Sequence, residues 1–94
     1  VDNNYAADIP QDDVPREVFL RRRSAAYQAY YEMMPLRASA RPTGPDLTLY
    51  RRFDYGRLAT FHVLDTRQYR TDQPCGDGNK APCPDALNPA ATVL

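Results

Sequence analysis

Apolar residues recur at helical intervals between residues 16 and 34. One stripe consists of Leu20, Tyr27, Tyr31 and Met34, and a neighbouring stripe consists of Phe19, Ala26, Tyr30 and Met33. Residues three, four and seven positions apart share one face of a helix. Pro15 suits a first helical turn, whereas Pro35 cannot continue the helix. The pattern therefore predicts an amphipathic helix over residues 14–35.

A second pattern, typical of strands, covers residues 47–65. Leu47, Leu49 and Phe53 alternate onto one face, with Arg51 as the exception. Residues 54–57 include Gly56, which can adopt a positive φ in a tight turn. Residues 58–65 are almost continuously apolar or β-branched, which is typical of a strand buried on both faces. The sequence therefore predicts a β-hairpin.

The remaining segments lack periodicity. Residues 1–13 are polar and predict a loop, and residues 36–46 form a linker rich in proline and glycine. Residues 71–94 contain four prolines and two glycines, and we expect an irregular arm that is weakly ordered by itself. The predicted fold class is α+β, with one amphipathic helix packed on a β-hairpin. Two strands are marginal as an isolated sheet, so the hairpin needs further neighbours.

Charge and composition narrow the classes of partner. Twelve basic residues balance twelve acidic ones, which gives no reason to expect a nucleic acid or an anionic membrane as partner. No segment is apolar for the length of a bilayer. Eleven of the basic residues are arginine, and either a GC-rich genome or phosphate chemistry would explain this bias. We expect most of the arginines at exposed positions, including the polar band of Arg21, Arg22 and Arg23. Exposed positions favour the GC-rich genome as the explanation. The opening residues resemble neither an initiator segment nor a signal peptide, so we expect a processed or excised segment.

Three runs, in this order, resemble one family. Residues 25–37 (AAYQAYYEMMPLR) resemble a helix of the alkaline phosphatase D (PhoD-like) family. The pairing of residues 49–53 (LYRRF) with 61–70 (FHVLDTRQYR) is similar to the same family. Residues 1–6 (VDNNYA) resemble the segment directly after its Trp-Asp-Asp-His-Glu signature. The resemblance extends from Val1 to about Cys83, and each run alone would be a weak signal.

The resemblance implies a fold and a reaction. Residues 1–94 would be part of a larger metallophosphatase β-sandwich with flanking helices. The whole protein would be a secreted alkaline phosphatase, exported by the twin-arginine route, that hydrolyses phosphate monoesters or diesters with iron and calcium. The family's signature, its Asp-Tyr-Glu cluster and its later histidine segments have no counterpart in the 94 residues. We therefore expect no catalytic residue, metal site or cofactor in this chain, which would depend on the remainder of the phosphatase domain.

Asp65, Arg67 and Arg70 form the most specific candidate group, at the end of the second strand. Asp65 and Arg67 would point to one face. An arginine fork there could bind a phosphate or orient a carboxylate ligand. The alternative is an Asp–Arg pair that stabilises the exit from the strand, and it is favoured because metals already perform the phosphate chemistry in the family.

Other polar residues have a functional and a structural interpretation. Asn3 and Asn4 would lie near the metals of the whole protein, although asparagines also cap loops. His62, the only histidine, has no neighbouring ligands in the sequence and is predicted to be a packed strand residue. Cys75 and Cys83 would form a disulfide in an oxidising compartment, with two free thiols as the alternative.

The tyrosines of the helix leave a second class of function open. Tyr27, Tyr30 and Tyr31 have helical spacing, which favours a core or an interface over a ligand-stacking cluster. An exposed tyrosine face would suit a small extracellular interaction or scaffold module without catalysis.

Overall fold

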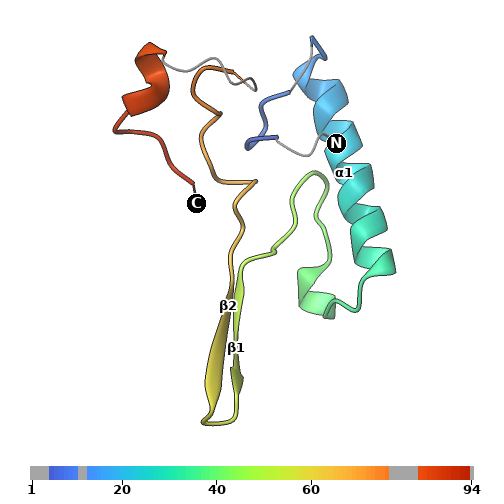
Figure 1. Cartoon of the computed structure of the whole chain (residues 1–94). Helices are drawn as coiled ribbons and strands as arrows, with labels where there is room; N and C mark the ends of the chain where they lie inside the picture. The colour runs from blue at the N-terminus through green and yellow to red at the C-terminus, as the bar shows by residue number, and fades with distance from the viewer. Residues whose placement is uncertain (1–4, 11–12, 77–82, 94) are drawn as a thin grey trace.

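The computed structural model describes residues 5–10, 13–76 and 83–93 (Figure 1). In chain order, the elements are α1 (Arg16–Met33), the 3₁₀ turn η1 (Ala38–Ala40), β1 (Arg51–Tyr55), β2 (Ala59–Val63) and the 3₁₀ turn η2 (Pro84–Leu87). The strands pair antiparallel as a two-stranded hairpin. The predicted α+β class, with one helix and one hairpin, is therefore confirmed. No helix in the described ranges has both the length and the apolarity to cross a membrane.

Local sequence explains the ends of α1. The backbone N–H groups of Val18 and Phe19 donate to the carbonyl of Pro15 at 2.9 and 3.1 Å, which starts the helical ladder. Glu17 places a negative charge in the first turn, where it interacts favourably with the helix dipole. At the other end Met34 has extended backbone angles, φ −108° and ψ 144°. The proline at position 35 explains this, because a residue before proline is disfavoured in the helical region.

The core joins α1 to two loop segments. The helix buries Phe19, Arg23 and Tyr27, which are spaced four residues apart, against Tyr5 and Leu47. The rings of Tyr5 and Phe19 lie 6.0 Å apart. The buried face therefore combines members of both predicted stripes and includes an arginine from the predicted polar band. The expectation that Arg23 is exposed was wrong, because its guanidinium finds hydrogen-bond acceptors in the loops that cover the helix.

The hairpin is offset from its predicted ends. Phe53 pairs with Phe61, and the turn occupies residues 56–58, where Gly56 has φ 54°. The first strand begins at Arg51 rather than residue 47, because the backbone of Leu47 is bonded to the side chain of Gln68 instead of to a strand.

The prediction that residues 58–65 are buried on both faces was wrong. Phe61 is 53% exposed, Leu64 is 60% exposed, and His62 is exposed rather than packed. Figure 1 shows the reason: the hairpin extends away from α1, and no other described segment lies along it. The helix packs on the loops around Tyr5 and Leu47, not on the strands.

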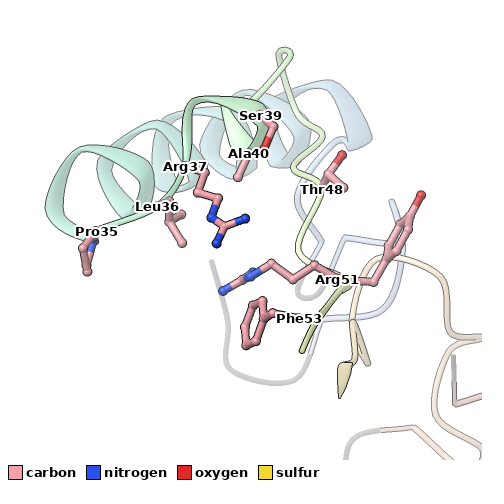
Figure 2. A pocket seen from close by; sticks show the side chains of 9 residues that line it. Pro35, Leu36, Arg37, Ser39, Ala40, Thr48, Arg51 and Phe53 are labelled. Atoms are coloured by element: carbon pink, nitrogen blue, oxygen red, sulfur yellow. The ribbon is translucent and has the colours of Figure 1, made fainter. Parts of the chain in front are cut away.

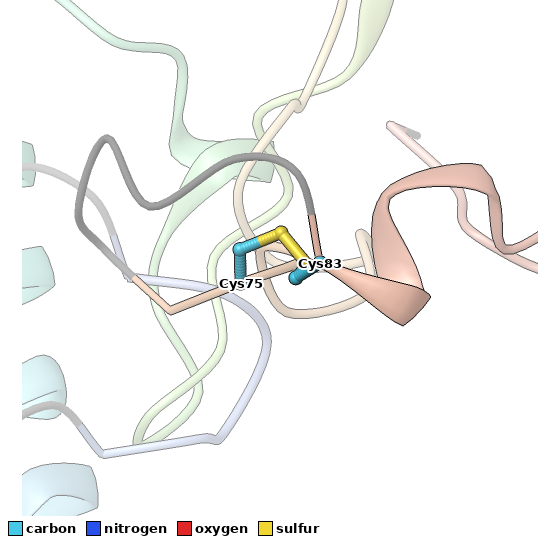
Figure 3. The surroundings of a disulfide bond; sticks show 2 residues. All are labelled: Cys75 and Cys83. Atoms are coloured by element: carbon cyan, nitrogen blue, oxygen red, sulfur yellow. A yellow bond between two sulfur atoms is a disulfide. The ribbon is translucent and has the colours of Figure 1, made fainter.

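The described parts of the C-terminal arm are irregular apart from η2. Cys75 and Cys83 form a disulfide with a Cα–Cα distance of 5.6 Å (Figure 3). Thr71 and Thr92 connect the two ends of the arm, since each backbone N–H donates to the other residue's hydroxyl, at 3.2 and 3.0 Å. The weak order expected of the isolated arm remains a prediction.

Candidate functional site

Asp65 organises the turn that follows β2. Its side chain is buried, with 4% of the residue exposed. Its Oδ1 accepts the backbone N–H groups of Arg67 and Gln68 at 3.0 and 2.9 Å. Its Oδ2 accepts the side-chain amide of Gln68. These bonds are those of an Asx turn, in which a carboxylate satisfies backbone donors.

Gln68 extends this turn across the molecule. Its Nε2 donates to the carbonyl of Leu47 at 2.6 Å, and its Oε1 accepts the backbone N–H of Leu47 at 3.1 Å. The side-chain amide thus pairs with both backbone groups of one residue, as a neighbouring strand would. Both residues are buried, so these bonds satisfy polar groups that would otherwise lose their hydration.

The same turn holds the segment Tyr5–Ala7. The backbone N–H of Ala7 donates to the carbonyl of Arg67 at 2.8 Å, and Nη2 of Arg70 donates to the carbonyl of Tyr5 at 3.3 Å. The hydroxyls of Tyr5 and Tyr27 are 2.5 Å apart. Tyr5–Ala7 is therefore tied to the exit from β2 and also to α1. It directly follows Asn3 and Asn4, which lie outside the described residues.

Arg23 connects α1 to two segments at once. Its Nε donates to the carbonyl of Pro45 at 2.7 Å, and its Nη1 donates to the carbonyl of Ala7. Its Nη2 forms an ion pair with Asp46 at 2.9 Å. Ala7 has φ +44°, a conformation that a residue with a Cβ adopts at a cost, so this segment depends on its surroundings.

Tyr27, the helix member of the buried tyrosine pair, is electrically neutral at ordinary pH. Burial is the main cause that raises the pKa of Tyr27 above its usual value, and the hydrogen bond with Tyr5 raises it further. The positive charge of Arg23, whose guanidinium lies 6.0 Å from the Tyr27 ring centre, lowers the pKa of Tyr27 by a smaller amount. Tyr27 therefore serves as a hydrogen-bonding core residue rather than as an anion or a base.

Asp65 and the two arginines predicted beside it line different cavities. The side chains of Arg67 and Arg70 line a cavity of about 430 Å³ together with Thr71 and Thr92. Asp65 lines another cavity, of about 350 Å³, with the aromatic rings of Tyr50 and Tyr69. Oδ1 of Asp65 accepts the backbone N–H of Arg67, so the carboxylate stabilises the exit from the strand through the backbone, and the Asp–Arg pair stays a prediction. Phosphate binding at Arg67 and Arg70 stays a prediction from the sequence.

The described ranges hold no cluster of three or more histidine, cysteine or carboxylate side chains that could bind a metal. His62 lies on the exposed hairpin opposite Arg52. These residues do not by themselves fit an iron or calcium site, so no reaction step is assigned to a metal here. Of the three helix tyrosines, Tyr27 is buried, Tyr31 is half-buried and Tyr30 is 41% exposed.

Three residues of this site were not identified from the sequence: Tyr5, Arg23 and Gln68. Arg23 did carry a signal, because it lies four residues from both Phe19 and Tyr27 and so falls on the apolar face of the helix. Gln68 carried none, since its partner Leu47 is 21 residues away. Tyr5 lies in the segment that the sequence predicts to be a loop, so it was not expected in the core.

Comparisons with known proteins agree on one family. The family model described as PhoD-like phosphatase matches residues 1–94. The chain is 60% identical over all of its 94 residues to alkaline phosphatase D of Bacillus subtilis (strain 168), of which it covers 16%. The solved structure of PhoD matches the whole chain with a TM-score of 0.89 and 60% identity, and 18% of that structure is covered. The chain therefore spans less than a fifth of these relatives, and over that span it belongs to the PhoD-like phosphatase family.

Proposed function

We propose that this chain is a supporting, non-catalytic part of a metal-dependent alkaline phosphatase that hydrolyses phosphate monoesters or diesters. The observation that carries the proposal is the 60% identity, over the full length of the chain, to alkaline phosphatase D. The covered share of that protein, 16%, supports the remainder of the phosphatase domain as the chain's principal partner. Neither a nucleic acid nor a membrane is proposed as a partner.

The role proposed for the chain is to position the segment that leads to Asn3 and Asn4. Tyr5–Ala7 is held by Arg70, Tyr27 and Arg23 and by the carbonyl of Arg67. Asn3 and Asn4, the proposed metal-adjacent residues, directly precede this anchored segment in the sequence. Asp65, Arg67 and Arg70 then act as site-supporting residues, and the cavity that Arg67 and Arg70 line is the place proposed for a phosphate group.

Iron and calcium are the metals proposed for the whole phosphatase, where they would polarise phosphoryl oxygens and activate an oxygen nucleophile. Export through the twin-arginine route is proposed for the same protein. The Cys75–Cys83 disulfide supports an oxidising destination, because such bonds persist mainly outside the cytosol. Residues 1–94 are proposed as one partial domain: a loop over 1–13, a helix within 14–35, a hairpin within 47–65 and an arm over 71–94.

The test compares the 94-residue chain with the longer phosphatase that contains it. Both are assayed for hydrolysis of p-nitrophenyl phosphate in the presence of calcium and iron. We expect turnover by the longer protein only. Turnover by the 94 residues would refute the non-catalytic role, and an inactive, metal-loaded longer protein would refute the phosphatase.

A matched pair of variants tests the supporting role in the longer protein. Arg70→Gln removes the donor to the carbonyl of Tyr5, whereas Arg57→Gln removes the same charge at the exposed hairpin turn. We expect reduced activity and reduced metal content in the first variant and neither effect in the second. Equal activities and metal contents would contradict the role assigned to Arg70.

A further inference from the structure

A pocket of about 310 Å³ lies between the exit from α1 and the start of β1 (Figure 2). Leu36, Arg37 and Ser39 line one wall, and Thr48, Arg51 and Phe53 line the other. Figure 2 shows the guanidinium groups of Arg37 and Arg51 directed into the same space from the two walls. This volume is at the lower end of the range for small-molecule sites.

The pocket combines positive charge with hydroxyl groups, and it lacks an acid among the described residues that line it. Two guanidinium groups in one pocket repel each other, and an anion between them removes that repulsion. Each guanidinium offers several N–H donors in a planar fork, and Ser39 and Thr48 add two hydroxyls. So many donors match the three oxygens of a phosphoryl group better than the two oxygens of a carboxylate.

Arg51 is already held in place for such a ligand. Its Nη1 donates to the carbonyl of Leu49 at 2.8 Å, and its guanidinium carbon lies 5.7 Å from the centre of the Phe53 ring. A side chain fixed in this way loses less conformational entropy when it binds. Phe53 is 37% exposed, and with Leu36 it gives the pocket an apolar wall that an aromatic or aliphatic group could cover.

We propose that this pocket is a non-catalytic binding site for an organic phosphate. The phosphoryl oxygens lie between Arg37 and Arg51, and the organic group lies on Leu36 and Phe53. This site is distinct from the cavity at Arg67 and Arg70, and the inference does not depend on the proposed hydrolytic activity.

The test is a titration of the 94-residue chain with phenylphosphonate, which resembles a phosphate ester but cannot be hydrolysed at its P–C bond. Binding is followed by NMR through the side-chain Nε–H signals of the arginines. We expect saturable binding with the largest shifts at Arg37 and Arg51. Inorganic phosphate should bind several-fold more weakly, because it cannot cover the apolar wall.

Charge-matched variants identify the site. Arg37→Gln and Arg51→Gln should each weaken binding about tenfold, as expected for the loss of one charged hydrogen-bonding group. Arg57→Gln, at the hairpin turn, should bind within twofold of the original chain, on the scale of other surface changes. Arg37 is exposed and is not tied to the core, so its substitution tests binding even if Arg51→Gln disturbs the fold.

Four results would overturn the proposal. These are the absence of saturable binding, an equal loss in Arg57→Gln, shifts centred on Arg67 and Arg70, and unchanged binding in Arg37→Gln. Inorganic phosphate binding as tightly as phenylphosphonate would overturn the proposed ligand class.

Discussion

Replacement of Arg23 by methionine tests how the core is held together. Arg23 is 5% exposed and donates to the carbonyls of Pro45 and Ala7 and to the carboxylate of Asp46. Methionine retains an unbranched apolar stem of similar reach and has good helix propensity. The variant therefore removes the donors while disturbing the helix little.

The expected cost follows from the three acceptors. The side chain of Asp46 is 73% exposed, so its carboxylate regains water when the arginine is lost, and that ion pair contributes only about 0–1 kcal/mol. The carbonyls of Pro45 and Ala7 face a side chain that is 6% exposed, and an acceptor left unsatisfied costs about 1–3 kcal/mol. Together these effects predict a loss of about 2–7 kcal/mol in the free energy of unfolding.

The assay is urea unfolding followed by far-ultraviolet circular dichroism, which reports on the 18 residues of α1. Arg22→Met is the matched control, because Arg22 is the exposed neighbour on the same helix and its replacement should change stability by less than about 0.5 kcal/mol. A domain of this size has little stability to lose, so Arg23→Met should be substantially unfolded before urea is added. Arg23→Lys keeps the charge but not the fork, and should be intermediate.

Equal unfolding midpoints for Arg23→Met and Arg22→Met would refute this reasoning. That result would mean that water replaces the guanidinium at both carbonyls without a cost. An Arg23→Lys variant as stable as the original chain would instead refute the importance of the fork, since one ammonium cannot occupy all three donor positions.

Three further predictions concern the tyrosine pair, the Asx turn and the arm. The pKa of Tyr27 is raised in the folded chain, so neutral Tyr27 contributes stability below about pH 10 that is lost as the pH rises further. Urea unfolding between about pH 9 and 11 should show this loss of stability. Tyr27→Phe should make the loss of stability over that pH range smaller. Asp65→Asn places an amide donor against the amide of Gln68 and should cost about 1–3 kcal/mol in the same assay, unlike Asp85→Asn at an exposed position. Reduction of the Cys75–Cys83 disulfide removes a loop restraint of about 2–3 kcal/mol. Amide exchange in residues 71–76 and 83–93 should therefore accelerate, while amide exchange in α1 should not. Unchanged exchange in the arm would contradict the restraint.

Sequence patterns were sufficient wherever the determinants are local. The helix from Arg16 to Met33 follows from apolar spacing, from Pro15 at its start and from Pro35 beyond its end. The hairpin follows from alternation and from Gly56 in its turn. These signals act within a few residues of one another, so they can be recognised in the sequence without knowing which segments pack against the helix or the hairpin.

The candidate site could be predicted only in part. Asp65 was singled out, and the structure gives its carboxylate to backbone donors two and three residues away, which is a local arrangement. Burial of the second strand was predicted wrongly. An apolar run indicates that a strand is suited to burial, but it does not show which segment would pack on it, and no described segment does. Phe61 and Leu64 therefore stay more than half exposed in this chain.

The sequence by itself determined the helix, the hairpin, the fold class and, through its order of runs, the phosphatase family. Only the tertiary structure decided that Arg23 is buried, that Gln68 pairs with the backbone of Leu47, and that Arg70 reaches the carbonyl of Tyr5 across 65 residues. The physical reason is that a buried polar side chain is stable only where acceptors or donors meet it, and those partners come from loops that carry no periodic signal.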